Sequence, residues 1–543
     1  MMDKSMTTGI AIRVPKDPLG PSPSPTNTGI AVTLVAVGMV IRILSFVASR
    51  NTGGDALARV ALAANWLQHP TLKVIFDTYP PGHFWLIGGL ALLVRDVGFA
   101  GRLLSLLLGI GSLLLVWKLA VMLYGETAAI FSLTVISLYT MHIAYSTTSS
   151  SEISYLFFLL LSLFCFFSYL REEPKHLSYL SLSGIALSIS ESIRFEAWVF
   201  FLGMFLLLAF PAVLNLDHRG GLWSRFRPVL TFGIAGGIWP VFMMAYCYRK
   251  FGDPMYLLNW THVRVQHLLA TQPSPVGYQL SLMPVALLIS LSPLALAAAT
   301  YGLMKSFGLP LPRALAAFAL LFFAIQNYQL FRGATTVVAR YSLTMGTLLA
   351  IFSGCGFALI CRELAYRRVR LAMAVVGALI SCNSLAVLAM SEVPNRYADK
   401  FASVSPRLRY PTRIAEVGKY LRTHMDSGDA VVIDDYNEES NILADASGLP
   451  VVPGERVYLQ SAKNAIDARQ YIEARRPRFL VYSDVGTLRS SLFLPKSCSQ
   501  DAGVDGVKFR CAFANRFYRV YELSYFESVL HPLRDTPSTS TLQ

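Results

Sequence analysis

The chain has 543 residues, of which 54% are hydrophobic and only 15% charged, and its formal net charge is +14. An average soluble domain carries about 25% charged residues, so this composition excludes an ordinary soluble enzyme. The many long apolar runs instead predict a polytopic α-helical membrane protein, because a helix needs roughly 20 apolar residues to cross a bilayer. The alternating strands of a membrane β-barrel are absent from the sequence.

The Lys and Arg residues are scattered among short loops and form no basic run with interleaved aromatic residues. Such a distribution is typical of membrane orientation and of contact with lipid headgroups. We therefore expect membrane lipids as neighbours of this chain and no nucleic-acid partner.

Segment 1–28 is polar and rich in Pro and Ser, which predicts a disordered cytoplasmic tail. A transmembrane domain is expected at 29–394, and its first span is expected to be retained, because it has no small-residue cleavage site. The predicted spans, about eleven, lie near 29–48, 101–123, 127–145, 153–170, 177–193, 196–214, 229–248, 279–302, 314–331, 341–361 and 371–391.

The loop 49–100 after the first span contains a short apolar segment, 82–94. This segment has only 13 residues, follows Pro80-Pro81 and stops at Arg95-Asp96. Its length is typical of a juxtamembrane or re-entrant helix rather than of a full crossing.

The distribution of basic residues decides the sidedness of this loop. If 82–94 does not cross and the N-terminus is cytoplasmic, the inner loops between residues 103 and 392 hold twelve Lys and Arg residues and the outer loops six. A crossing would swap these numbers, so the positive-inside rule favours the first arrangement. It places the loop 49–100 and the C-terminal part outside, which for a bacterial inner membrane is the periplasmic side.

Asp55 stands out because it lies at the mouth of the first span, in Gly53-Gly54-Asp55-Ala56. An acid in this position of a membrane protein is a functional candidate. Apolar residues recur at helical spacing after it, so Asp55 and Arg59 are expected to share one face of a surface helix. The alternative is that Asp55 only caps this helix.

On this topology, other unusual polar residues gather at the same outer surface. Charges at membrane depth are costly unless they are paired or line a wet cavity, so this grouping predicts a polar site. They are Tyr79 in the first outer loop, Glu152 in the second outer turn, Glu191 and Arg194 in the third, Arg249 and Lys250 in the fourth, and Arg340 and Tyr341 in the last.

The chemistry that fits this site is transfer from a lipid-anchored phosphate. Arg194 and Arg340 would hold the phosphate, because guanidinium groups bind phosphate oxygens strongly and in pairs. Asp55 would take the proton from an acceptor hydroxyl or amine. Structural alternatives stay open: Glu152 as a helix cap, Arg194 paired with Glu191 or Glu196, and Arg340 as a headgroup anchor. Ordinary interface residues are the alternative for Arg249 and Lys250.

Several motifs resemble those of the GT-C glycosyltransferases, in particular the protein-mannosyltransferase and aminoarabinose-transferase type. The resemblance covers about residues 30–390 and rests on Gly54-Asp55, Tyr79-Pro80-Pro81-Gly82, Gly101-Arg102-Leu103-Leu104-Ser105 with Gly109, Phe251-Gly252-Asp253-Pro254 and Arg340-Tyr341. It implies that a sugar passes from a polyprenyl-phosphate donor to a glycan, lipid or protein acceptor on the outer face, usually with inversion.

The same resemblance matches the family's loop carboxylate to Asp55, its acid at the second outer turn to Glu152 and its late arginine to Arg340. The chain differs from many members at Ala56 and at Arg194-Phe195. The oligosaccharyltransferase branch binds a divalent metal through acidic pairs. No comparable outer pair lies within 29–394, so no metal or other cofactor is expected to be required.

The candidate residues can now be stated together. Asp55 and Glu152 are the candidate catalytic residues, and the candidate substrate-binding residues are Arg59, Tyr79, Glu191, Arg194, Arg249, Lys250, Arg340 and Tyr341. Two other functions remain as alternatives, a transporter or lipid flippase and a scaffold protein without catalysis. Transporters place their sites near mid-membrane between repeated halves, and no internal repeat is visible here.

Segment 395–533 has the composition of a small extracytoplasmic α/β domain, and 534–543 that of a disordered tail. Apolar runs at 430–433 and 479–482 predict buried strands, and 414–424 and 462–474 predict helices. Cys498 and Cys511 form either a disulfide, which an oxidising compartment would favour, or two free thiols.

Overall fold

The computed structural model describes most of the chain. The described residues are 25–52, 54–71, 79–172, 176–210, 222–271, 276–335, 338–363, 369–393, 401–426, 429–434, 439–448, 458–459, 472, 474, 476–483, 498, 502–504 and 506–526. The chain divides into two compact units, Met1–Arg409 and Tyr410–Gln543. Most of the predicted helix 462–474 and tail 1–28, and the whole tail 534–543, lie outside the described residues.

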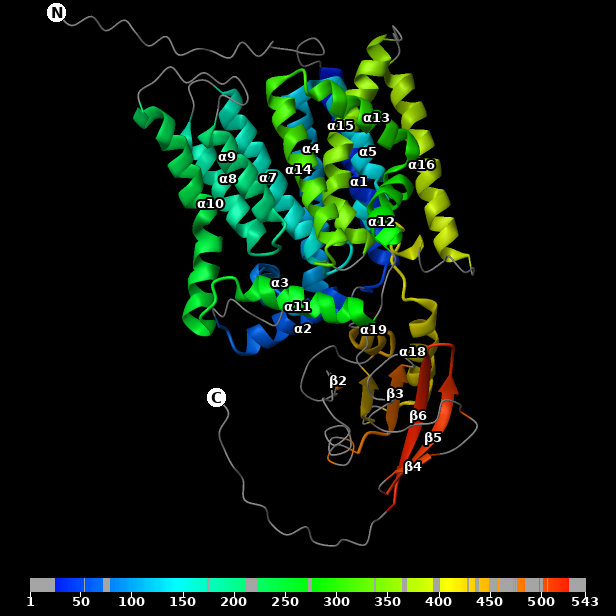
Figure 1. Cartoon of the computed structure of the whole chain (residues 1–543). Coiled ribbons are helices and arrows are strands. Elements are labelled where there is room, and N and C mark those ends of the chain that lie inside the picture. The colour runs from blue at the N-terminus through cyan, green and yellow to red at the C-terminus, as the bar shows by residue number, and fades with distance from the viewer. Residues whose placement is uncertain are drawn as a thin grey trace, which may run out of the picture. The chain divides into compact units, whose positions relative to one another are not determined.

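The elements given for the described residues of the first unit are all helices, as its composition predicts (Figure 1). Its helices are α1 (Pro25–Ala48), α2 (Gly54–Gln68), α3 (Gly82–Val94), α4 (Val97–Tyr124), α5 (Glu126–Leu138), α6 (Thr140–Tyr145), α7 (Ser151–Arg171), α8 (Leu177–Glu191), α9 (Ala197–Ala209), α10 (Leu222–Phe251), α11 (Tyr256–Thr271), α12 (Val276–Leu291), α13 (Pro293–Ser306), α14 (Pro310–Phe331), the 3-10 turn η2 (Ala339–Tyr341), α15 (Ser342–Glu363) and α16 (Val369–Glu392). Helix α1 begins at Pro25, earlier than the expected end of the tail.

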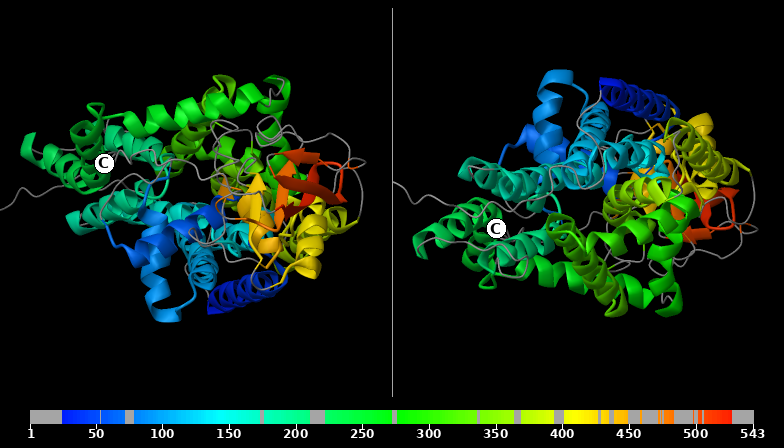
Figure 2. Two further views of the ribbon diagram at one scale, coloured as in Figure 1. Left: turned by 90° about the horizontal axis from the view of Figure 1, so that it is seen from below. Right: turned by 90° about the horizontal axis from the view of Figure 1, so that it is seen from above.

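The long helices of this unit run side by side as a bundle, which Figure 2 shows from both ends. By length and composition, seven of the described helices could cross a membrane, or up to eight if α12 and α13 form one bent span. Helix α3 has 13 residues and is too short to cross a bilayer as a straight helix. Helices α2, α3 and α11 lie at one end of the bundle (Figure 1), called here the Asp55 end.

Two of the expected spans are broken, which corrects the predictions of continuous helices at 127–145 and 279–302. The first breaks at Tyr139, whose backbone is extended, and the second bends by 110° at Ser292. Ser292 has a φ of +83°, and the residue before a proline is disfavoured in helical conformation. Hydropathy could not reveal either break, because the flanking residues are equally apolar.

The carbonyl groups that these breaks release are satisfied by side chains from other helices, as the apolar surroundings require. Asn383 donates from Nδ2 to the carbonyl oxygen of Ile289 at 2.9 Å, and Thr140 donates from Oγ1 to that of Ser290 at 3.3 Å. Ser384 donates to the carbonyl oxygen of Leu138 at 2.9 Å. The two breaks are therefore supported by hydrogen bonds.

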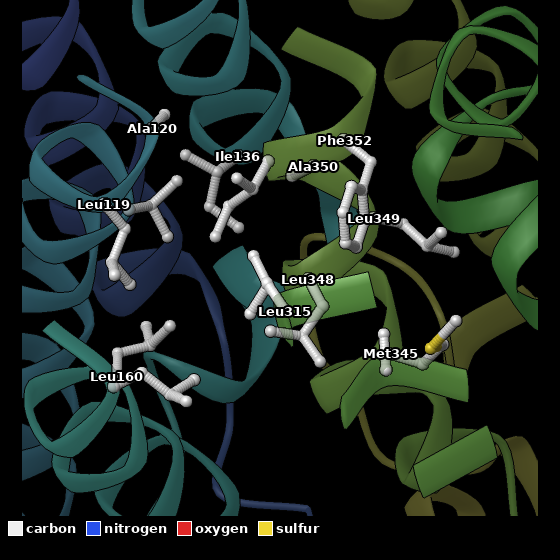
Figure 3. Close-up of a cluster of buried hydrophobic side chains, with 14 of the residues drawn as sticks. Leu119, Ala120, Ile136, Leu160, Leu315, Met345, Leu348, Leu349, Ala350 and Phe352 are labelled. Atoms are coloured by element: carbon white, nitrogen blue, oxygen red, sulfur yellow. The ribbon is translucent and has the colours of Figure 1, made fainter. Parts of the chain in front are cut away.

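Helix α15 runs through the middle of the apolar core, where Leu348, Leu349 and Phe352 lie among side chains of other helices (Figure 3). Its approach to α13 depends on glycine. A Cβ atom on Gly356 would lie 2.0 Å from the carbonyl oxygen of Ala298, and one on Gly302 would lie 2.0 Å from that of Phe352. Only glycine allows the two backbones to pack this closely.

After α16, the chain returns to the end of α1. The backbone NH of Arg50 donates to the carbonyl oxygen of Leu408 at 2.9 Å, and the backbone NH of Leu408 donates to the hydroxyl of Ser49 at 3.0 Å. These bonds join 401–409 to the helical unit. The first compact unit accordingly extends to Arg409.

The second unit contains one mixed sheet with strand order β2-β1-β3-β6-β5-β4. Its described elements are α18 (Thr412–His424), β1 (Val431–Asp434), α19 (Glu439–Ala446), β2 (Tyr458–Leu459), β3 (Phe479–Ser483), β4 (Ala502–Val504), β5 (Val507–Ala514) and β6 (Tyr518–Tyr525). Strand β1 pairs in parallel with β2 and β3, and β3 pairs antiparallel with β6. The predicted α/β fold and both of the predicted strands are confirmed.

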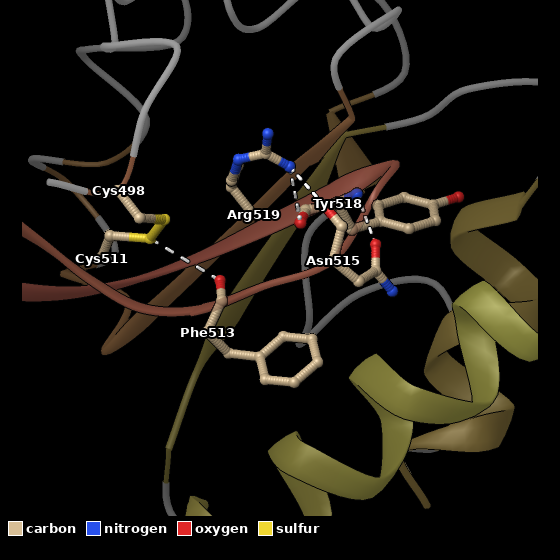
Figure 4. Close-up of a disulfide and its surroundings, with 6 residues drawn as sticks. All are labelled: Cys498, Cys511, Phe513, Asn515, Tyr518 and Arg519. Carbon is tan, nitrogen blue, oxygen red and sulfur yellow. Dashed lines mark hydrogen bonds between the residues drawn. A yellow bond between two sulfur atoms is a disulfide. The ribbon is translucent and has the colours of Figure 1, made fainter.

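Cys498 and Cys511 form a disulfide across 13 residues, with their Cα atoms 5.2 Å apart (Figure 4). This resolves the two alternatives that the sequence left open. The other five cysteines, Cys165, Cys247, Cys355, Cys361 and Cys382, are free.

The glycine contact between α13 and α15 yields a stability prediction. We expect Gly356→Val to lower the free energy of unfolding by about 1–3 kcal/mol, because the added carbons force the two backbones apart. The measurement is the thermal unfolding midpoint of the purified protein in detergent. Gly237→Val in α10 is the matched control, because a Cβ there meets nothing within 4 Å. Equal shifts for the two variants would contradict the packing described here.

Candidate active site

The loop that carries Asp55 is held by the second turn at the Asp55 end, which connects α6 with α7. The side chain of Asn51 makes three of the contacts. Its Oδ1 accepts from the hydroxyl of Thr148 at 2.7 Å and from the backbone NH of Ser149 at 3.0 Å, and its Nδ2 donates to the Ser149 hydroxyl at 3.1 Å. Asn51 is buried, so these bonds fix the start of the loop.

Arg102 of α4 ties the same two segments together. Its guanidinium donates to the carbonyl oxygen of Thr147 at 2.8 Å and to that of Ser49 at 3.0 Å, and it also donates to that of Phe46. Its cation lies over the Phe46 ring, with Cζ 4.3 Å from the ring centroid. Arg102 therefore joins the end of α1 to the second turn.

Two glycines of α4 allow this turn to approach closely. A Cβ on Gly101 would lie 2.6 Å from the hydroxyl of Ser149, and a Cβ on Gly109 would lie 2.3 Å from that of Ser146. Together with Arg102, they account for the Gly101-Arg102 motif with Gly109. In this structure the motif supports the site rather than forming its reactive part.

Helix α3 begins against the third turn, which connects α8 with α9. The backbone NH of Gly82 donates to the carbonyl oxygen of Ser192 at 2.8 Å, and a Cβ on Gly82 would lie 2.1 Å from the Ser192 hydroxyl. The next residue, His83, is buried, and its Nε2 lies 2.9 Å from the carbonyl oxygen of Ser149. The Tyr79-Pro80-Pro81-Gly82 segment is thus held between the second and third turns.

Asp55 lies in the first turn of α2, and both of its carboxylate oxygens have partners. Tyr79 donates its hydroxyl to Oδ1 at 2.8 Å, and Arg340 of η2 forms an ion pair with Oδ2. Asp55 and Tyr79 belong to the segment between α1 and α3, and Arg340 belongs to the turn before α15, 285 residues after Asp55 in the sequence. The structure thereby brings together three residues that the sequence only placed on one side.

Glu152, in the first turn of α7, is shared between two arginines. Its Oε1 lies 2.8 Å from Nη1 of Arg194 and 3.3 Å from Nε of Arg340. Only 6% of the Glu152 side chain is exposed, so its charge depends on these two cations.

Arg194 also pairs with Glu196, whose Oε1 lies 2.6 Å from Nη2. The ring of Tyr341 lies near both arginines, with its centroid 5.3 Å from Cζ of Arg194 and 5.8 Å from Cζ of Arg340. The result is a chain of alternating charge, here called the charge chain, with the order Asp55, Arg340, Glu152, Arg194 and Glu196.

Arg59 is the cation beside this chain that has the fewest partners. It lies one helical turn after Asp55, as the i and i+4 spacing predicts, and its Cζ lies 4.6 Å above the Tyr79 ring. It is buried, yet its Nε and Nη1 have no hydrogen-bond partner among the described residues. Burial lowers the pKa of Arg59, and the charges of Asp55 and Glu152 act in the opposite direction.

The electrostatics of Arg194 differ from those of Arg59. Burial by itself would lower the pKa of the Arg194 guanidinium, but the Glu196 and Glu152 carboxylates outweigh burial and raise it. Arg194 is therefore a permanent cation in this structure, held in place by two carboxylates.

Three predicted site residues do not join this cluster. Arg249 and Lys250 lie in the last turn of α10, where Lys250 lies over the rings of Tyr246 and Phe251. Among the contacts of the described residues, none joins either cation to the charge chain.

Glu191 is fully buried at the end of α8, and neither of its carboxylate oxygens has a hydrogen-bond partner among the described residues. The predicted topology placed all three residues on the same side of the membrane, but it cannot tell how far apart they lie within the plane of the membrane.

One member of the charge chain was not among the sequence candidates for the site. Glu196 was considered only as a partner of Arg194, and the structure confirms this pairing. The sequence signal was its position two residues after Arg194 in a tight turn. The capping alternative for Glu152 is not what the structure shows, since no side-chain cap is formed at the start of α7 and Glu152 instead binds arginines.

The six charges of the site balance. Three carboxylates face three guanidinium groups: Asp55, Glu152 and Glu196 against Arg59, Arg194 and Arg340. Among the described residues, no group of three or more His, Cys, Asp or Glu side chains is arranged to hold a metal ion. The arrangement can bind a phosphate through its arginines and can offer a carboxylate to an acceptor proton.

The buried position of Glu152 gives a prediction about stability. We expect Glu152→Gln to lower the free energy of unfolding by about 3–5 kcal/mol, because it leaves two buried arginines without their shared carboxylate. Denaturant unfolding in detergent micelles measures the change. Glu392→Gln is the control: Glu392 lies 3.4 Å from Arg407 in a more exposed pair, where a loss of less than about 1 kcal/mol is expected. Similar small losses in both variants would contradict the pairing described for Glu152.

Comparison with known proteins supports the interpretation of the fold. Residues 78–224 match the family model of the dolichyl-phosphate-mannose-protein mannosyltransferases. No curated protein matches this sequence significantly.

Solved structures resemble this chain despite low identity. The ArnT structure from Cupriavidus metallidurans in the apo state has a TM-score of 0.61 at 14% identity and covers 91% of this chain and 98% of its own. The archaeal oligosaccharyltransferase AglB from Archaeoglobus fulgidus, solved with an inhibitory peptide and a dolichol-phosphate, has a TM-score of 0.51 at 13% identity and covers 84% of this chain and 69% of its own. The chain therefore shares the fold of these two structures, which agrees with the fold that its resemblance to the GT-C glycosyltransferases predicts.

Proposed function

We propose that this protein is a membrane glycosyltransferase that moves a sugar from a polyprenyl-phosphate-linked donor to an acceptor at the outer face of the membrane. The observation that carries the proposal is the charge chain at the Asp55 end of the helical unit, where three carboxylates and two arginines meet and Arg59 lies beside them. The acceptor is a hydroxyl or amine of a glycan, a lipid or a protein.

In this reaction, Asp55 is the general base, and the arginines hold the phosphate of the donor. The acceptor attacks the anomeric carbon, with inversion, while its proton passes to the Asp55 carboxylate. Arg59, Arg194 and Arg340 stabilise the negative charge that develops on the leaving phosphate. Glu152 holds Arg194 and Arg340 in position.

Two structures with the same fold support the choice of donor. ArnT from Cupriavidus metallidurans has been solved with undecaprenyl phosphate, with a TM-score of 0.60 to this chain, and AglB has been solved with a dolichol-phosphate. Both ligands are polyprenyl phosphates. No resident metal is part of the proposed reaction, because each carboxylate of the charge chain is already paired with a guanidinium.

Asp55→Asn tests the assigned base. We expect the rate of sugar transfer from a polyprenyl-phosphate sugar to fall by about 10²–10⁴-fold, because the amide cannot accept the proton. The measurement is release of polyprenyl phosphate by the reconstituted protein in the presence of EDTA. Asp96→Asn is the control, since Asp96 caps α4 and asparagine caps equally well. Undiminished transfer by Asp55→Asn, or transfer that requires added metal, would contradict the proposal.

A transporter or lipid flippase is the second candidate, and one observation favours it. The bend between α12 and α13 is the kind of broken helix that transporters use at their binding sites. The charge chain, however, lies at one end of the bundle and not at its middle. Movement of a polyprenyl lipid across proteoliposomes without any sugar transfer would favour this alternative.

The disulfide provides a test of sidedness with native residues. If the second unit is outside, an impermeant reductant applied to intact spheroplasts should open the Cys498–Cys511 bond, and an impermeant maleimide should then add to both thiols. Peptide mass spectrometry identifies the labelled cysteines. The Cys498→Ser/Cys511→Ser chain should lose this labelling. Labelling only after the cells are lysed would place the unit on the cytoplasmic side.

A further inference from the structure

The ion pair of Asp55 creates a conflict with its proposed role as base. Both carboxylate oxygens are engaged, one by the Tyr79 hydroxyl at 2.8 Å and the other by Arg340. A carboxylate that is ion-paired with a guanidinium is a weaker proton acceptor than a free one, because the cation stabilises its charged form. In the arrangement described, Asp55 is therefore masked.

Arg340 has a second carboxylate partner that would keep it near the site. Its Nε lies 3.3 Å from Oε1 of Glu152, which is itself held by Arg194 at 2.8 Å. Glu152 is the least exposed member of the charge chain, with 6% of its side chain exposed, whereas Asp55 and Arg340 are exposed by 17% and 19%. Of the two ion pairs of Arg340, the one with Asp55 is thus easier for an incoming anion to reach than the one with Glu152.

Arg59 offers a second cation for the anion beside this ion pair. It lies one helical turn after Asp55 in α2, and its Nε and Nη1 have no hydrogen-bond partner among the described residues. A buried guanidinium with unused donors is costly unless an anion completes its hydrogen bonds. A phosphate next to Arg59 would also lie within reach of Arg340, since both arginines interact with the Asp55 carboxylate.

We propose that the donor phosphate takes Arg340 away from Asp55 while Glu152 retains Arg340 at the site, so that Asp55 becomes a base only when the donor has bound. This exchange rests on the proposed function and adds a sequence of events to it. Arg340 acts as the exchanged group, and Glu152 is the positioning residue that limits its movement.

The group transfer that follows is balanced. A bond forms between the acceptor oxygen or nitrogen and the anomeric carbon, and the bond between that carbon and the phosphate oxygen breaks with its electron pair on the phosphate. The acceptor proton moves to the freed Asp55 oxygen. Protonated Asp55 no longer competes for Arg340, which stays on the polyprenyl phosphate until this product leaves and the proton returns to water.

A double-mutant cycle on binding tests the exchange, with undecaprenyl phosphate as the probe and the full chain in detergent micelles. In the unaltered chain, Asp55→Asn should tighten binding by at least about fivefold, the lower end of typical coupling between sites, because Arg340 is then free for the phosphate. In an Arg340→Gln background, the same Asp55→Asn change should alter the affinity by less than about twofold, because no exchange remains to be favoured.

The Arg340→Gln background distinguishes the exchange from simple electrostatic repulsion between Asp55 and the phosphate. If Asp55 only repelled the phosphate, removing its charge would give the same gain with and without Arg340, and that result would overturn the exchange. No gain in either background would overturn it as well. Asp96→Asn, which removes a charge outside the charge chain, should leave the affinity unchanged.

The outcomes also distinguish this inference from the proposed function. Undecaprenyl phosphate that does not bind the unaltered chain at all would refute the proposed function and the exchange with it. Binding with equal gain in both backgrounds would refute the exchange alone. If Arg340→Gln does not fold, Arg340→Met replaces it as the background, since an unbranched thioether side chain fills a similar space without a charge.

Discussion

The charge chain is the interaction on which the rest of the site depends. Its members are delivered by four separate segments, and each cation in it touches two carboxylates. Charges next to a bilayer are tolerated only when each is compensated, so moving any one segment would leave its partners unpaired. The ends of α2, α7, α9 and α15 must therefore stay in register with one another.

The motifs around the site maintain this register without entering the chemistry. Arg102 and Asn51 attach the Asp55 loop to the second turn, while Gly82 and Gly101 remove the side chains that would keep the segments apart. A similar role belongs to buried Arg42 of α1. Its guanidinium donates to carbonyl oxygens near the end of α5 and lies 2.8 Å from Nδ1 of His142 in α6. These contacts support the break at Tyr139 between the two helices.

The sequence was most informative about the helical architecture and about which charged residues lie at the same end of it. Hydropathy predicted the helical domain and the short α3, and the pattern of basic residues grouped the charged residues that became the charge chain. They could not separate Asp55 and Arg340, which meet, from Arg249 and Lys250, which lie apart, because hydropathy reports position along the membrane normal only. The partners of Glu152 depend on how the helices pack laterally, and lateral packing leaves no periodic pattern in the residues of any one helix.

The neutrality of the six site charges has a consequence for the proposed reaction. A phosphodiester donor carries one negative charge, and its product, a phosphate monoester, carries up to two near neutral pH. When Asp55 takes the acceptor proton, the site gains one positive charge at the moment when the leaving phosphate gains its extra negative charge. Proton transfer and leaving-group departure therefore stabilise each other electrostatically, and the arginines need no additional cation to balance the product. A site with one more fixed cation would instead bind the product phosphate more tightly and would slow its release.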